Sequence, residues 1–259
     1  MRLELVLGGL AAALAAFVVV TSVRDARARA LRRQTDAVHR DTTILGAGKV
    51  QGSVRYALVP KGQGQTTPPD ELRRRVQSLA AGTYVNDLLT EQDSALYRWP
   101  DRASDALRVY VEPASAVPDW SASYPQVARE VFDEWSEAGF PLTFTFIYDS
   151  ASADITIHWV DRFGAEEGQR IGVTKRIQTS RFLIARAEID VATHDSTGRA
   201  LSARLVGGVL RHEIGHALGL NHANDSRSVM YRESATSTIS SVDRATLRLL
   251  YLVPAGSLK

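Results

Sequence analysis

The stretch that decides the fold runs from His212 to His222 and reads HEIGHALGLNH. His212 and His216 are four residues apart, so in a helix they lie on one face, a turn apart, and both imidazoles can reach one metal ion. Glu213 lies beside the first histidine, where its carboxylate can take a proton from a water molecule at the same ion. The spacing therefore predicts a helix that presents two metal ligands and a general base.

The end of this helix is expected to supply a third ligand. Gly219 can end the helix because glycine adopts the left-handed backbone conformation at low cost. The resulting turn brings His222 back towards the ion. Three neutral imidazoles with one open position form the arrangement of a catalytic zinc site. We therefore predict one zinc ion, held by His212, His216 and His222.

A chance match and a purely structural zinc site are the alternatives to this prediction. A bare H-E-x-x-H arises by chance in roughly one such chain per hundred. Requiring Gly219 and His222 as well lowers that chance by roughly three orders of magnitude. A structural zinc site usually has four protein ligands and tends to use cysteine, and the chain has no cysteine. Both considerations favour a catalytic site.

The motif and the following Met230 resemble the metzincin clan of zinc endopeptidases, and with Ser-Val-Met-Tyr at 228–231 they are most similar to the matrixin family. The resemblance implies that Met230 forms a hydrophobic floor under the metal and that Glu213 is the general base. Ala223 stands where matrixins usually have a serine, and Arg232 stands where they usually have a proline. Neither position holds the metal in the family.

Residues 98–259 are expected to form the catalytic domain, with an α+β, zincin-like fold: a mixed, twisted sheet of about five strands and three main helices. Alternating apolar residues predict the strands, and apolar residues at helical spacing predict the helices. Their order, strand, helix, four strands, helix, Met-turn, helix, is the matrixin order. The expected strands are 107–111, 142–148, 154–160, 171–177 and 182–191, and the expected helices are 124–138, 201–219 and 242–252.

The first 97 residues are expected to lie outside that domain. Residues 1–23 form a transmembrane anchor or a signal segment, because residues 5–23 are uncharged, apolar and long enough to span a lipid bilayer as a helix. A cleaved signal peptide is the alternative, since Ala28 and Ala30 are small residues at the required spacing. Residues 24–97 are expected to form a basic stalk, a flexible linker and a helical extension over 70–90, which could serve as a prosegment.

Two signals disagree about the side of the membrane on which the catalytic domain lies. Five arginines follow the apolar run between residues 24 and 33, whereas only Arg2 precedes it. The positive-inside rule would then keep the domain in the cytoplasm. Matrixins are mostly extracytoplasmic, so the resemblance implies the opposite. We favour a single-pass, N-terminally anchored membrane protein with an extracytoplasmic catalytic domain.

The composition limits the remaining classes. Hydrophobic residues make up 44% and charged residues 23% of the chain, as in ordinary globular proteins. A net charge of +2 does not indicate a nucleic-acid binder. The absence of cysteine excludes disulfides, thiolate metal sites and the cysteine-based latency of many matrixins. We expect a monomer.

Further metal ions are not expected. His158 lies on a predicted strand and His194 in a predicted turn beside Asp195. The segment between residues 160 and 171 is short and lacks the histidine-rich loop that builds the second zinc site of matrixins. Asp190 and Asp195 alone supply too few ligands for calcium.

The resemblance implies a zinc-dependent endopeptidase that hydrolyses polypeptide substrates. The alternative is a catalytically silent zinc module that binds a peptide or protein, but this would leave Glu213 without a role.

Four residues are candidates for contact with the substrate: Gly208, Tyr231, Ile171 and Val173. Gly208 lies four residues before the first histidine, where it would leave a deep S1′ pocket; alternatively, Gly207 and Gly208 only permit close helix packing. An extended substrate is expected to add as a strand along residues 171–177.

Overall fold

The structure, a computed structural model, describes residues 54–59, 67–102, 105–164, 168–233 and 238–259, and of residues 54–59 it describes the backbone. The apolar run at residues 5–23 and most of the expected stalk lie outside the described residues. Within the described ranges, no helix is both long enough and apolar enough to cross a membrane.

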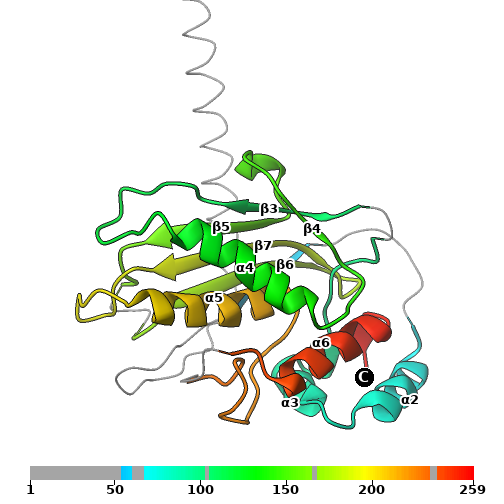
Figure 1. The fold of residues 1–259 in the computed structure, drawn as a ribbon. Coiled ribbons are helices and arrows are strands. Elements are labelled where there is room, and N and C mark those ends of the chain that lie inside the picture. The colour runs from blue at the N-terminus through cyan, green and yellow to red at the C-terminus, as the bar shows by residue number, and fades with distance from the viewer. Residues whose placement is uncertain (1–53, 60–66, 103–104, 165–167, 234–237) are drawn as a thin grey trace, which may run out of the picture. The chain divides into compact units, whose positions relative to one another are not determined.

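A mixed sheet of six strands forms the centre of the fold, in the order β1-β6-β7-β5-β3-β4 (Figure 1). β6 runs antiparallel to β7, and the other neighbouring strands are parallel. The expected mixed sheet of about five strands is present, and β1 adds a strand that the sequence analysis did not predict. The strands are β1 (Val54–Val59), β3 (Leu107–Val111), β4 (Phe144–Phe146), β5 (Ile155–Val160), β6 (Gly172–Thr179) and β7 (Ile184–Ala192).

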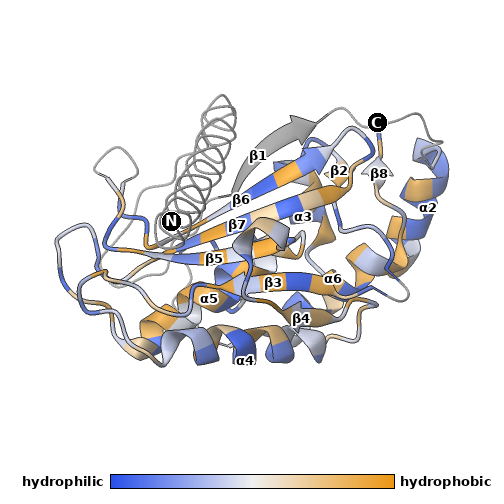
Figure 2. Cartoon of the chain, turned by 90° about the horizontal axis from the view of Figure 1, so that it is seen from above, coloured by the Kyte–Doolittle hydropathy of each residue, from blue (hydrophilic) through white to orange (hydrophobic). Residues whose placement is uncertain are grey.

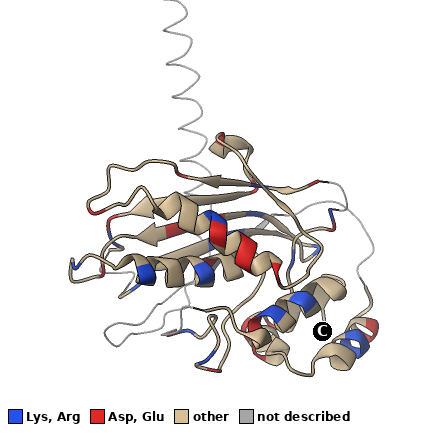
Figure 3. Ribbon diagram, viewed as in Figure 1, with Lys and Arg blue, Asp and Glu red and all other residues tan. Residues whose placement is uncertain are grey.

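Two helices, α4 (Tyr124–Ser136) and α5 (Ala203–Ala217), pack side by side on one face of this sheet (Figure 1). Buried apolar residues of the strands meet them, and the strands carry hydrophobic stretches along their length (Figure 2). Acidic residues of α4 and basic residues of α5 lie along the visible side of the pair (Figure 3). Arg211 joins Glu134 through two contacts of 2.6 and 2.5 Å, which fix α5 against α4.

The helical extension expected over 70–90 forms two helices, α2 (Pro69–Leu79) and α3 (Val85–Glu91), that share the core of the catalytic elements. Leu72 and Leu88 are fully buried in that core. The last helix, α6 (Ser241–Leu252), lies beside them (Figure 1). A two-stranded ribbon of β2 (Ala95–Leu96) and β8 (Gly256–Ser257) joins the two ends of this region.

The helix of the motif is two residues shorter at each end than its periodicity predicts. It begins at Ala203 because Ser202 is its N-cap, with the hydroxyl accepting a hydrogen bond from Leu205 N. It ends in a left-handed turn at Gly219, whose φ is +111°. Leu220 N donates to Gly215 O and Gly219 N donates to His216 O, both at 3.0 Å, which is the hydrogen-bond pattern of a Schellman motif.

Replacing Gly219 with alanine should lower the free energy of unfolding by about 3 kcal/mol or more. A side chain there would adopt an unfavourable φ, and its Cβ would lie 2.6 Å from Tyr97 O and 2.8 Å from Leu250 Cδ2. Gly139→Ala is the matched control, since Gly139 also has a positive φ but no atom within 4 Å of the added Cβ. Denaturant unfolding should show a control loss of only about 1 kcal/mol. Equal losses in the two variants would contradict the packing argument.

Candidate metal centre

Three imidazoles converge at the end of α5. His212 and His216 lie on consecutive turns of the helix, and His222 returns from the turn after Gly219. One ring nitrogen from each side chain lies within 4.8 Å of the others, and in the described part of the chain no other group of histidines and carboxylates meets this condition. The two helical histidines are fully buried.

A hydrogen bond orients each imidazole from its outer nitrogen. Nδ1 of His212 lies 2.7 Å from Val229 O, and Nδ1 of His216 lies 2.9 Å from Leu220 O. Nδ1 of His222 lies 2.8 Å from a carboxylate oxygen of Glu91. All three partners are acceptors, so each Nδ1 carries the proton and each Nε2 keeps its lone pair.

The inner nitrogens fit a divalent metal. Nε2 of His212 and Nε2 of His216 are 3.0 Å apart, close to the roughly 3.3 Å that two imidazole ligands of one tetrahedral zinc require. Burial lowers the pKa of His212 to about 3 and lowers that of His216 well below its ordinary value, so both rings stay neutral. Nε2 of His222 is buried without a hydrogen-bond partner. Lone pairs that face one another in a dry site are stabilised by a cation.

Glu213, next to His212 in α5, has its carboxylate against β6. Its Oε2 accepts a hydrogen bond of 2.7 Å from Thr174 Oγ1, whereas its Oε1 is buried without a partner. Burial raises the pKa of the Glu213 carboxyl well above its ordinary value, against the opposing effect of Thr174. Gly172 provides the room, because a Cβ there would lie 2.5 Å from Glu213 Oε1 and 2.6 Å from Val209 Cγ1. β6 therefore holds the carboxylate through a glycine and a threonine two residues apart.

Met230 packs against α5 at Gly215. A Cβ at Gly215 would lie 2.4 Å from Met230 Sδ, so glycine between the two helical histidines permits the contact. The turn is fixed by Asp243 at the start of α6, which accepts hydrogen bonds from Ser228 Oγ and from Val229 N. The carbonyl of Val229 orients His212, so Asp243 indirectly fixes that ring.

Buried donors satisfy the last carbonyls of α5. Arg176 Nη1 donates to His216 O at 3.0 Å, Trp99 Nε1 to Ala217 O at 2.9 Å and Tyr251 OH to Leu218 O at 2.8 Å. A guanidinium is also favoured by the negative end of the helix dipole. The same guanidinium donates to Asn221 Oδ1 at 2.7 Å, within the turn that carries His222. These contacts fix the position at which the chain leaves the helix.

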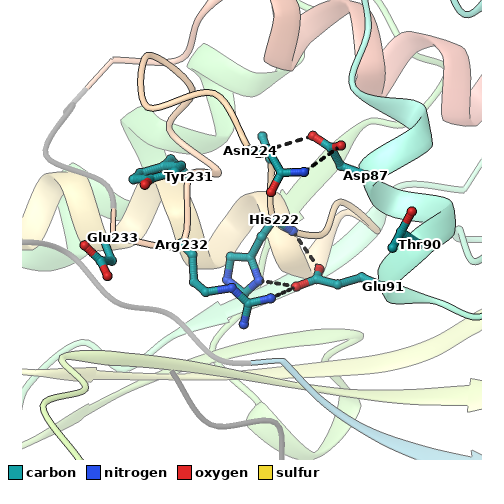
Figure 4. A pocket seen from close by; sticks show the side chains of 9 residues that line it. Asp87, Thr90, Glu91, His222, Asn224, Tyr231, Arg232 and Glu233 are labelled. Atoms are coloured by element: carbon teal, nitrogen blue, oxygen red, sulfur yellow. Dashed lines mark hydrogen bonds and ion pairs between the residues drawn. The ribbon is translucent and has the colours of Figure 1, made fainter. Parts of the chain in front are cut away.

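Helix α3 supports the same turn from the other side (Figure 4). Glu91 lies between His222 and Arg232, and Asp87 contacts Asn224. Burial alone would raise the pKa of Glu91, but the hydrogen bonds from His222 and the charge of Arg232 hold it below its ordinary value. Together with Tyr231, these residues line a pocket of about 310 Å³ beside the third histidine.

The candidate substrate residues lie in different surroundings. Tyr231 lines the pocket next to His222. Ile171 and Val173 are both buried, so contacts with a bound chain at that edge would come from the backbone. Gly208 is buried within α5. Gly207 faces α4, where an added Cβ would lie 3.7 Å from Val127 Cγ1, an ordinary contact distance, so the packing of the two helices does not itself require glycine at this neighbour.

The two other histidines considered as ligands make separate contacts. His158 Nδ1 lies 3.6 Å from Glu112 on the sheet. His194 is buried with Nε2 2.9 Å from Asp119 and Nδ1 2.8 Å from Asp161. Both ring nitrogens of His194 therefore contact carboxylates, and these two contacts connect three loop segments.

Several site residues were missed in the sequence analysis. The missed residues on β6 are Gly172, Thr174 and Arg176, which are every second residue of the strand. Because side chains of a strand alternate between its two faces, all three face α5. That alternation was visible in the sequence, but the helix it would meet was not. Glu91 carries no local signal, because its partner His222 is 131 residues away.

Replacing Gly172 with alanine should destabilise the protein by about 1–3 kcal/mol, the usual cost of overpacking, because the added Cβ meets Glu213 and the branched side chain of Val209. Gly207→Ala is the matched control: its Cβ would lie 3.1 Å from Nη1 of Arg211, the guanidinium nitrogen that takes no part in the two contacts with Glu134. In this helix interior, alanine should be neutral or stabilise by up to about 1 kcal/mol. Chemical denaturation of both variants measures the difference, and a neutral Gly172→Ala would contradict the described contact.

Comparisons with known proteins identify the family. A metalloendoproteinase of Arabidopsis thaliana, 1-MMP, is 29% identical over 114 residues, covering 40% of this chain and 30% of the plant protein. Among solved structures, the GM1-bound form of the ECX AB5 holotoxin superposes with a TM-score of 0.45 at 15% identity, over 64% of this chain and 87% of that one. The family model of the matrixin peptidases (Peptidase_M10) matches residues 115–252, more than half of the chain and including all three histidines. The chain belongs to the matrixin family.

Proposed function

We propose that this protein is a zinc-dependent endopeptidase, with residues 98–259 as its catalytic domain. The observation that carries the proposal is the set of three converging imidazoles, each with a hydrogen bond at Nδ1. Glu213, the residue that follows His212 in the chain, has a buried carboxylate oxygen without a hydrogen-bond partner. Family membership agrees with it. His212, His216 and His222 would hold one zinc ion.

Zinc in this position would polarise the scissile carbonyl and bring the pKa of a water molecule towards neutrality. Glu213 would take the proton of the attacking water through Oε1 and deliver it to the leaving amine nitrogen. Thr174 holds the other oxygen in place, so the carboxylate needs no reorganisation during the transfer. Glu213 itself is left free of ligand duty because three histidines already converge.

The substrate would bind as an extended chain along β6, through backbone hydrogen bonds. In the structure β1 already pairs with this edge, in parallel register from Val54 opposite Thr174 to Val59 opposite Thr179. β6 is therefore paired on both sides, by β1 and by β7. We propose that β1 leaves the edge before a polypeptide adds there.

We also propose that residues 5–23 anchor the protein in a membrane with the catalytic domain outside the cytoplasm. The proposal is supported by the uncharged apolar composition of this run and by the family resemblance.

Glu213→Gln should abolish proteolysis while zinc remains bound. The amide keeps the shape of the side chain but cannot take the proton, which should lower the cleavage rate of an unfolded protein substrate by about 10²–10⁴-fold. Zinc content should stay near one equivalent, whereas His216→Ala, the control, should lose it. Cleavage within a few-fold of wild type would show that another group is the base. An inactive wild type that binds zinc and peptide would favour the silent binding module.

Weakening β1 should increase activity. The double variant Ala57→Pro/Leu58→Pro changes two consecutive residues, so at least one backbone N–H directed at β6 is lost, and proline is incompatible with a paired strand. We expect several-fold faster cleavage of an unfolded protein, measured as initial rate. Unchanged zinc content and melting temperature serve as controls for an intact catalytic unit. An unchanged or slower rate in an intact variant would contradict the proposed competition at this edge.

A further inference from the structure

The three histidines differ in what orients them. His212 and His216 donate to backbone carbonyls within the segment that matches the matrixin model. His222 donates to the side chain of Glu91, which lies on α3, before the first residue of that segment. The third ligand therefore depends on a residue outside the segment that matches the matrixin model.

Glu91 contacts His222 at two points. Its Oε1 lies 2.8 Å from Nδ1 of the ring, and its Oε2 accepts a hydrogen bond of 2.9 Å from the backbone N–H of His222. This two-point contact fixes both the backbone and the ring direction. His222 has no helix to hold it, unlike the other two histidines, because the chain has left α5 at Gly219.

Arg232 completes the arrangement. Its guanidinium forms an ion pair with Oε1 of Glu91, the oxygen that faces the ring. The side chains of Glu91 and His222 are 19% and 10% exposed, so the contact between Glu91 and His222 is largely shielded from water. Arg232 stands at the position where the sequence analysis noted a departure from the usual matrixin proline. Arg232, which departs from the family pattern, thus contacts Glu91, the carboxylate that α3 supplies.

The rest of α3 binds the turn without touching a ligand. Asp87 accepts hydrogen bonds of 2.9 Å from the backbone and from the side-chain amide of Asn224. The side-chain amide of Gln92 lies 2.7 Å from Asn221 Oδ1. Substitutions at these neighbours therefore test the packing of α3 against the turn separately from the orientation of His222.

We infer that Glu91 is a positioning residue for the metal centre: its carboxylate, oriented by Arg232, fixes the tautomer and direction of His222 and strengthens its binding to the ion. The inference rests on the proposed zinc site. A carboxylate that accepts from the outer nitrogen of a ligand histidine raises the basicity of the inner nitrogen and holds the ring in place. Loss of such a partner typically weakens metal binding 10–100-fold.

The test is zinc affinity of the full chain, measured by competition with a chromophoric chelator. Glu91→Ala should bind zinc 10–100-fold more weakly than wild type. Glu91→Gln should lie between them, because its amide oxygen still accepts from Nδ1–H but has no charge. Asp87→Ala is the matched control, since it removes two hydrogen bonds between α3 and the same turn but none to a ligand, and it should stay within about threefold of wild type.

A spectroscopic readout separates orientation from stability. Cobalt-loaded Glu91→Ala should show shifted visible bands, because the ligand geometry changes, whereas cobalt-loaded Asp87→Ala should match wild type. Wild-type affinity in Glu91→Gln together with Glu91→Ala would overturn the inference, as would an equal loss in Asp87→Ala. If Glu91→Ala does not fold, wild-type affinity in Glu91→Gln alone overturns it. A wild-type chain without zinc would instead refute the proposed function.

Discussion

Fixing three imidazoles in one tautomer is the constraint on which the rest of this structure depends. Each ring offers the lone pair of Nε2 to an ion when its proton is on Nδ1, and a hydrogen-bond acceptor at Nδ1 favours that tautomer. The three acceptors come from three different parts of the chain. Val229 O belongs to the Met-turn, Leu220 O to the turn after α5, and the carboxylate of Glu91 to α3. The helix supplies the spacing of two ligands, but the orientation of all three requires the tertiary fold.

The second requirement is a rigid end to α5. The Schellman turn at Gly219 works only if the carbonyls it leaves behind are paired, since a buried unpaired carbonyl costs about 1–3 kcal/mol. The donors are Trp99, which follows β2 in the chain, Arg176 on β6 and Tyr251 on α6. The buried guanidinium of Arg176 would be unfavourable without partners, but here it donates to the carbonyl oxygen of His216, at the C-terminal end of α5, and to the amide oxygen of Asn221. The site thereby links the sheet to the final helix, so the convergence of the three histidines requires the tertiary fold.

The motif, its helix, the closing glycine and the order of strands were predictable because their signals are local: a spacing of four, a twofold alternation, a residue tolerant of positive φ. The helical extension over 70–90 was also visible as apolar spacing. Its role was not, because the contact between Glu91 and His222 joins residues far apart in sequence, and one sequence does not reveal such pairs. β1 was not predicted although Val54, Tyr56 and Leu58 are apolar, since its pairing with the predicted strand at residues 171–177 could not be inferred from the sequence. Gly172 looked like an ordinary strand residue until Glu213 was placed against it.

The two N-terminal elements next to the site differ in how they are held, and this difference has a functional consequence. α3 buries Val85 and Leu88 in the common core, so detaching it would expose apolar surface and release the third ligand from Glu91. β1 is an edge strand, joined to the sheet through one ladder with β6. An edge strand can leave a sheet without breaking the ladders behind it. Clearing the edge of β6 therefore does not require moving α3, the helix that orients His222.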